Sequence, residues 1–312
     1  MAECQAFREL QQRTGVLISG STALAFVDRA LPYTASSDLD LYVEQRYAHT
    51  VGMWLLSQGY TFFRSNTQPR GFEEAIESLG TQDTTKTELM EVDHLEMYRM
   101  RGVSGVFDFK NTYAGEERKV QLIVSKRCPM EIILNFHSTV VMNVIGFDFA
   151  YCLFPKATLE HRIAIVHSTS GPHQRDARAK YVERGWRMVL STKELIPVEK
   201  SCFVNGRRFL GDAQCWSIPL TEAARLRPNF DRLRLNGALI AYNRLGRWMA
   251  FEVATSPVLN HNFTIDIAPR SWSTLEQWFK QAAEILDNDG RRAGVFDAAL
   301  GRLAESLHKL PA

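Results

Sequence analysis

The chain is poor in the features that mark several large classes of protein. It has only five cysteines among 312 residues, an odd number, and no two of them form a Cys-x-x-Cys pair. A disulfide framework needs an even, closely spaced set of cysteines, and a structural zinc site needs ligands in closely spaced pairs. The cysteine pattern therefore argues against both.

Long hydrophobic runs are also absent. The longest apolar stretch, 140–154, is interrupted by polar residues such as Asn143 and Asp148, and it is shorter than the roughly 20 residues that span a bilayer. The N-terminal segment mixes charged and small residues without the apolar centre of a secretion signal. We therefore expect a soluble, intracellular protein of the cytoplasm with no membrane partner.

Several catalytic signatures do not occur in the sequence. It contains no Gly-x-Ser-x-Gly elbow, no Walker A loop and no His-Glu-x-x-His motif. Serine hydrolases, P-loop proteins and zincin-type proteases each depend on the corresponding spacing. None of these three activities is expected.

Periodicity predicts an α/β (α+β) fold. Apolar residues alternate with polar ones over 38–43 and recur at helical spacing over 22–31. The strand-like segments 103–110 and 119–125 flank a turn-rich connection, which predicts a β-hairpin. We interpret the run 140–154 as a buried helix.

The length of the chain allows two regions. We predict a core of residues 1–150, built as a mixed sheet backed by helices. Residues 151–312 are predicted to form a helical segment followed by a mixed α+β region, which packs on the core or binds an acceptor.

The most informative stretch is 20–42, in which a Gly-Ser turn, an apolar helix-like run and a strand with two aspartates follow one another. Asp38 and Asp40 lie two residues apart, and alternate residues of a strand project to the same face. Paired carboxylates suit Mg²⁺, which binds one or two of them together with substrate phosphates. Gly20 and Ser21 then lie where N–H groups at a helix start can meet a phosphate.

A simpler interpretation of the aspartate pair stays open. Two carboxylates at a strand end can face solvent, or one of them can pair with a cation such as Arg29. The Gly20-Ser21 turn taken alone is an ordinary helix start. Only the combination of turn and aspartates favours a metal site.

This combination resembles the signature of the nucleotidyltransferase-fold superfamily, which includes DNA polymerase beta. The Gly-Ser-Thr-Ala-Leu and Ser-Asp-Leu-Asp-Leu segments are most similar to the compact branch of aminoglycoside nucleotidyltransferases and AbiEii-type toxins, and the chain as a whole resembles fungal members of the superfamily. The resemblance covers about residues 16–124. It implies that Mg²⁺ or Mn²⁺ supports transfer of a nucleoside monophosphate from an NTP such as ATP to a hydroxyl or phosphate of an acceptor (RNA, protein or a small molecule).

The resemblance also implies a third carboxylate on a neighbouring strand, acting as a metal ligand or as the base. The expected position holds Gln121, whose amide brings no negative charge and takes no proton at neutral pH. Asp108, on the partner strand, is the candidate substitute. A catalytically inactive module that binds nucleotide, nucleic acid or a protein is therefore the alternative.

Basic residues provide two further candidates. The segment 156–180 resembles a basic helical region of the AbiEii-like group that meets the triphosphate, so Lys180 and Arg175 are candidate phosphate ligands, although a solvated helix face explains them equally simply. The segment 207–247 carries eight arginines against three acids, with aromatic residues between them. Such a mixture suits base stacking and phosphate contact, which predicts an acceptor-binding surface, although a plain solvated face is the simpler alternative.

Overall fold

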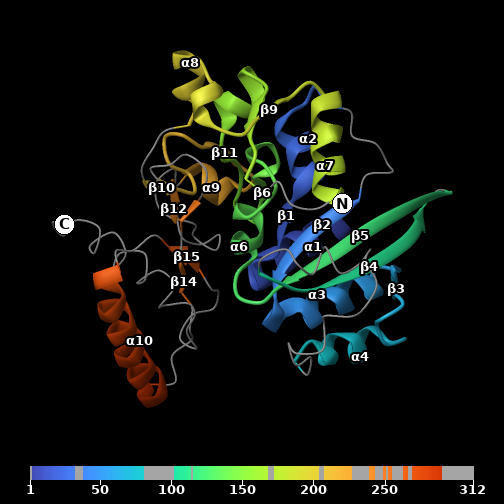
Figure 1. Cartoon of the computed structure of the whole chain (residues 1–312). Helices are drawn as coiled ribbons and strands as arrows, with labels where there is room; N and C mark the ends of the chain where they lie inside the picture. Colours follow the sequence, from blue (N-terminus) through green and yellow to red (C-terminus); the bar gives the residue numbers. More distant parts are fainter. Residues whose placement is uncertain are drawn as a thin grey trace.

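A computed structural model describes residues 2–31, 38–80, 102–113, 115–167, 172–203, 207–226, 239–242, 249–250, 252–254, 263–265 and 269–289. It centres on a mixed eight-stranded sheet in the order β11-β7-β6-β1-β2-β5-β4-β3 (Figure 1). The strands are β1 (Leu17–Ser19), β2 (Leu39–Glu44), β3 (Thr61–Phe63), β4 (Val103–Tyr113), β5 (Glu116–Ser125), β6 (Asn143–Ile145), β7 (Phe149–Cys152) and β11 (Trp216–Pro219). The predicted fold class, a mixed sheet backed by helices, is confirmed.

The centre of the sheet is built from segments that the sequence predicted to be strands. β1 pairs antiparallel with β2, and Ser19 lies opposite Asp40. β2 pairs parallel with β5, and β5 pairs antiparallel with β4 to complete the predicted hairpin. Strands β2, β5 and β4 therefore lie next to one another in the sheet, which brings their polar side chains to one face.

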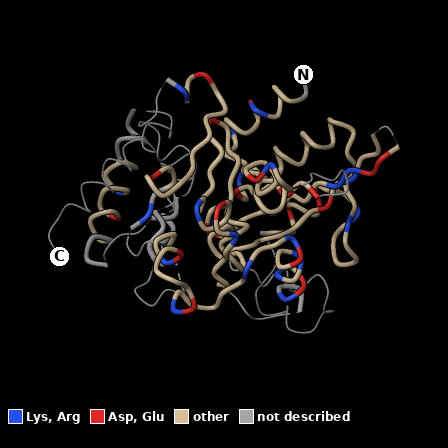
Figure 2. Tube along the Cα trace, turned by 90° about the horizontal axis from the view of Figure 1, so that it is seen from above, with Lys and Arg blue, Asp and Glu red and all other residues tan. Residues whose placement is uncertain are grey.

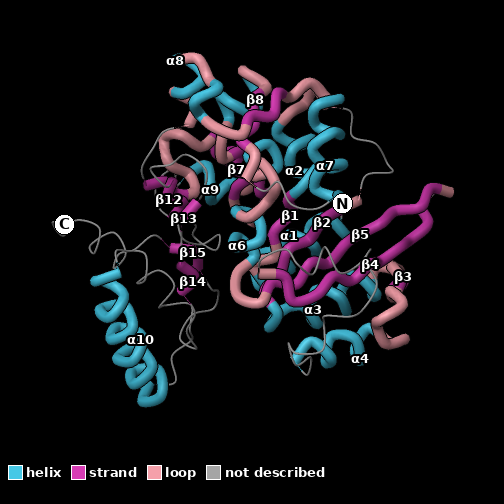
Figure 3. Tube along the Cα trace, viewed as in Figure 1, coloured by secondary structure: helices cyan, strands magenta, loops and turns pink. Residues whose placement is uncertain are grey.

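Helices cover both faces of this sheet (Figure 3). They are α1 (Ala2–Thr14), α2 (Gly20–Val27), α3 (Gln45–Ser57), α4 (Phe72–Glu77), α6 (Pro129–Leu134) and α7 (Pro172–Glu183). Leu41 of β2 packs with residues of α1, α3 and α4, whereas its neighbour Tyr42 packs with residues of α2, α6 and α7 on the opposite face. Burying one such side chain stabilises the fold by about 1.5–3 kcal/mol. Successive residues of β2 therefore pack alternately into the two hydrophobic cores on opposite faces of the sheet.

The chain beyond residue 150 adds smaller elements. Two of the large sheet's strands, β7 and β11, include residues from this part of the chain. The remaining strands are β8 (Ile163–Ile165), β9 (Arg187–Val189), β10 (Arg207–Phe209), β12 (Leu239–Tyr242), β13 (Met249–Ala250), β14 (Glu252–Ala254) and β15 (Phe263–Ile265). The helices are α8 (Pro197–Lys200), α9 (Glu222–Leu226) and α10 (Pro269–Asp289), and the short turns are η1 (Ser78–Gly80), η3 (Thr139–Val141), η4 (Lys156–Glu160) and η5 (Thr192–Glu194). Across the described ranges, no helix combines the length and the apolar character needed to cross a membrane.

The prediction of a helix over 140–154 is wrong. The segment forms the turn η3 followed by strands β6 and β7. Val144 packs into the core that contains Tyr42, and Ile145 packs into a separate cluster with Ala23. A strand covered on both faces has apolar residues at consecutive positions, so its sequence lacks the alternation that distinguishes a strand from a buried helix.

Charged residues of both signs are interspersed along the described trace (Figure 2). The predicted acceptor surface over 207–247 lies only partly within it. Its arginines Arg227, Arg232, Arg234, Arg244 and Arg247 fall outside the described residues. Arg208 is buried and pairs with Asp212, so it supports the fold and is not available to an acceptor.

Candidate functional site

The start of α2 lies directly against the carboxylate of Asp40. Strand β1 ends at Ser19, opposite Asp40, and the chain enters α2 through Gly20 with a φ of +69°. A Cβ atom on Gly20 would lie 2.4 Å from Oδ2 of Asp40, a distance that real Cβ atoms do not tolerate. The left-handed backbone favours glycine here, and any larger residue would also have to displace the Asp40 carboxylate. The predicted phosphate turn and the predicted metal ligand are therefore in contact.

A second contact joins the same two elements. The Thr22 hydroxyl, in the first turn of α2, donates a hydrogen bond of 3.0 Å to the backbone carbonyl of Asp38. Ser19 and Asp40 are already held together by the β1–β2 ladder. The first turn of α2 is thus fixed relative to both aspartates, and Ser21 lies within it, partly exposed.

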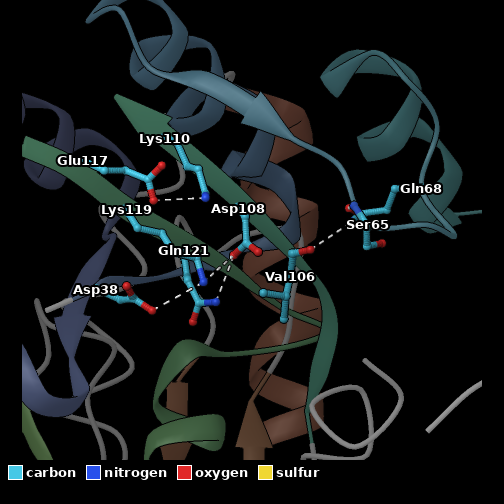
Figure 4. A network of polar contacts seen from close by, with 9 residues as sticks. All are labelled: Asp38, Ser65, Gln68, Val106, Asp108, Lys110, Glu117, Lys119 and Gln121. Atoms are coloured by element: carbon cyan, nitrogen blue, oxygen red, sulfur yellow. Dashed lines mark hydrogen bonds and ion pairs between the residues drawn. The ribbon is translucent and has the colours of Figure 1, made fainter. Parts of the chain in front are cut away.

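Asp40, Gln121 and Asp108 form one row across three strands. Gln121 is the register partner of Asp40 on one side and of Asp108 on the other. Its Nε2 donates a hydrogen bond of 2.9 Å to Oδ1 of Asp108 (Figure 4). The sequence predicted that Asp108 lies on the strand paired with Gln121, and this placement is confirmed.

Lys119 lies between two of the three carboxylates, those of Asp38 and Asp108. Its Nζ lies 3.4 Å from Oδ2 of Asp38 and 3.7 Å from Oδ1 of Asp108 (Figure 4). Lys110, two residues after Asp108 on β4, pairs with Glu117 at 3.0 Å. Lys119 is therefore the cation of this site.

The environment of Asp40 disfavours its ionised form. Burial of the carboxyl group, followed by the nearby charge of Asp38, raises the pKa of Asp40 to about 7. Lys119 and Lys180 act in the opposite direction, and Asp108 adds to the increase. Within the described chain the Asp40 carboxylate has no hydrogen-bond donor and no ion-pair partner, and Arg29 is exposed without an ion pair. Asp40 is thus a poorly solvated acid beside another acid.

Helix α7 brings one predicted basic residue near the site. Lys180 is exposed, and its positive charge lowers the pKa of Asp40. The next residue, Tyr181, is buried, and its ring lies 5.8 Å from that of His137 and 6.1 Å from that of Trp186. These contacts anchor α7 while Lys180 stays accessible. Arg175 lies in the first half of α7; it is exposed and forms no ion pair with either aspartate.

Two carboxylates of this site, those of Asp38 and Asp40, are the candidate ligands for a divalent cation. No three His, Cys, Asp or Glu side chains of the described residues are arranged to hold a metal. Asp38 and Asp40 nevertheless supply two carboxylates, which is the number that Mg²⁺ uses when phosphates and water complete its shell. Because a cation within about 4–6 Å favours an ionised carboxylate, the unpartnered group of Asp40 would gain most from it.

Lys119 is the site residue that the sequence analysis missed. It lies two residues before Gln121 on β5, so the period-2 rule places both side chains on one face. That spacing was a usable signal. What could not be read from it was that the ammonium group reaches Asp38 on β2 as well as Asp108 on β4.

Comparisons of the chain with protein-family models, with curated proteins and with solved structures find no match. The likeness to nucleotidyltransferase-fold proteins is carried by the motif residues alone. Any assignment of function therefore depends on the site.

Proposed function

We propose that the protein is a metal-dependent nucleotidyltransferase, which moves a nucleoside monophosphate from an NTP to a hydroxyl or phosphate of an acceptor. The observation that carries the proposal is the contact between Gly20 and the Asp40 carboxylate. A phosphate held by N–H groups at the start of α2 would lie beside a cation held by Asp38 and Asp40. A triphosphate with a bound divalent cation provides this arrangement of a negative phosphate beside a positive ion.

Each residue has a distinct part in this scheme. Asp38 and Asp40 would hold Mg²⁺ or Mn²⁺, which supplies positive charge to the phosphates. Gly20 offers its N–H without a side chain in the way, and Ser21 offers an N–H and a hydroxyl. Lys180 would add an exposed positive charge from α7 for the distal phosphates.

Asp108 is the candidate base. Gln121 and Lys119 both contact its Oδ1, and no hydrogen bond or ion pair of the described residues involves Oδ2. A carboxylate oxygen with no donor can accept the proton of an acceptor hydroxyl. Gln121 and Lys119 would then act on Asp108 by fixing its orientation.

One observation favours the alternative of an inactive binding module. Gln121 occupies the centre of the row between Asp40 and Asp108, where a carboxylate would bring a charge. An amide can hydrogen-bond to a nucleotide, but it brings no negative charge to a cation and takes no proton at neutral pH. The two functions are distinguished by turnover, because both predict that an NTP binds.

The test uses the full chain and the four common NTPs. We expect at least one NTP to raise the melting temperature only when Mg²⁺ or Mn²⁺ is present, and to release pyrophosphate when RNA, protein or small-molecule acceptors are supplied. Asp38→Asn should abolish both the NTP-dependent stabilisation and the release of pyrophosphate. Glu116→Gln, at an exposed position of the β4–β5 hairpin, should change neither. Metal-dependent binding without pyrophosphate release would support the inactive module. No metal-dependent effect of any NTP would contradict both functions.

A further inference from the structure

The carboxylates of Asp38, Asp40 and Asp108 outnumber the ammonium groups that contact them directly, and the excess equals the charge of one divalent cation. Asp38, Asp40 and Asp108 act on one another electrostatically and contribute three negative charges when ionised. Lys119 contributes one positive charge through its contacts with Asp38 and Asp108. The remaining two negative charges match a single Mg²⁺ or Mn²⁺. Exposed Lys180, which contacts none of the three directly, is left for the phosphates.

Lys119 occupies the place between Asp38 and Asp108. Its side chain is 28% exposed, less than Asp38 at 42%, so the ammonium group lies within the site rather than beside it. Asp108 also receives the amide of Gln121 on the same oxygen that faces Lys119. Asp108 therefore has one hydrogen-bond donor, Gln121, and one ion-pair partner, Lys119, while Asp40 has neither among the described residues.

We propose that the site binds one divalent cation, on Asp38 and Asp40, and that Lys119 supplies at Asp108 the positive charge that a second metal ion would otherwise supply. This inference rests on the proposed function, because it concerns the same carboxylates. It adds the metal stoichiometry and a positioning role for Lys119. It also makes Lys119 a competitor of the metal for Asp38, since both are attracted to the same carboxylate.

Removal of Lys119 should therefore strengthen metal binding. A variant Lys119→Met leaves three carboxylates without their cation, so a divalent ion should bind about tenfold more tightly, or a second ion should bind, because the like charge near the ion is gone. A lysine whose ion pair lies away from the three carboxylates should have no such effect on a metal.

The main experiment counts Mn²⁺ on the full chain by electron paramagnetic resonance. We expect one ion on the wild type, and tighter binding or a second ion on Lys119→Met. Lys110→Met is the matched control, because Lys110 lies on the neighbouring strand and pairs with Glu117 and not with Asp38, Asp40 or Asp108. It should bind Mn²⁺ as the wild type does. Two ions on the wild type, or unchanged binding by Lys119→Met, would overturn the inference while leaving the proposed function intact.

A second experiment is independent of metal. Melting temperatures in EDTA are compared for Lys119→Met, Asp108→Asn and the double variant. If Lys119 pairs with Asp108, the two losses should be less than additive. Additive losses would overturn the inference without reference to metal. If the wild type binds no Mn²⁺ at all, the proposed function fails, and the inference fails with it.

Discussion

Replacement of Asp40 by asparagine should stabilise the metal-free protein at neutral and alkaline pH. Burial and the charge of Asp38 raise the pKa of Asp40 from 3.8 to about 7 in the folded chain. Between these two values the unfolded state releases its proton while the folded state keeps it, so stability falls as pH rises from about 4 to 7. Above pH 7 Asp40 is ionised in both states, and the full free-energy cost of holding its charge in the folded protein lowers stability. Asparagine does not titrate and avoids this cost.

The size of the effect follows from the pKa. Each pH unit between the folded and unfolded values corresponds to about 1.4 kcal/mol, so the ceiling for Asp40 is about 4 kcal/mol. Asp40 is partly exposed, and solvent screening reduces the effect, so we expect about 2 kcal/mol. In a chain of this length such a gain raises the melting temperature by about 4 °C.

Urea unfolding followed by tryptophan fluorescence, in EDTA, measures the effect. The advantage of Asp40→Asn over the wild type should be small at pH 4, grow up to about pH 7 and stay constant to pH 8. Added Mg²⁺ and NTP should stabilise the wild type and leave the variant unchanged. An Asp40→Asn protein that is less stable than the wild type at pH 8 without metal would refute the reasoning, because it would mean that Asp40 is held by a favourable partner.

Two further predictions concern the surroundings of the site. Gly20→Ala should cost about 1–3 kcal/mol because of its left-handed backbone, and should also abolish Mg²⁺-dependent NTP stabilisation; Gly115→Ala, with a φ of +83° but no atom within 4 Å of its Cβ, should lose some stability and keep the NTP effect. An NTP effect that survives Gly20→Ala would argue against phosphate binding at α2. Burial and then Arg178 lower the pKa of His137 to about 4, so between pH 6.5 and 4 the unfolded state binds more protons and stability falls as the pH is lowered. His137→Gln should make the urea-unfolding profile less steep in this pH range, and an unchanged slope would show that His137 does not titrate there.

The parts of the site that the sequence predicted are those fixed by strand periodicity and register. The alternation over 38–43 placed Asp38 and Asp40 on one face, and the hairpin pattern placed Asp108 on the strand that pairs with the strand of Gln121. Both inferences need only neighbouring residues and one turn. The contact of Gly20 with Asp40 follows from the short connection between β1 and α2, which the Gly-Ser turn indicated.

The parts that were not predicted depend on long-range packing. The segment 140–154 forms strands because helices and a second cluster cover both faces of β6 and β7, and a sequence window contains neither partner. Likewise, the choice of Lys119 over Lys110 as the cation of Asp108 depends on β2 lying beside β5. A parallel neighbouring strand, whose paired residues lie 81 positions apart in sequence (Leu39 opposite Val120), brings Asp38 to Lys119, and no local pattern encodes this pairing.

Anomalous scattering from a crystal grown with Mn²⁺ and a non-hydrolysable NTP tests the central claim most directly. The account predicts one Mn²⁺ peak at coordination distance from carboxylate oxygens of both Asp38 and Asp40, with the triphosphate lying against the backbone of Gly20 and Ser21. A triphosphate bound elsewhere, or a Mn²⁺ peak that does not touch Asp40, would contradict it.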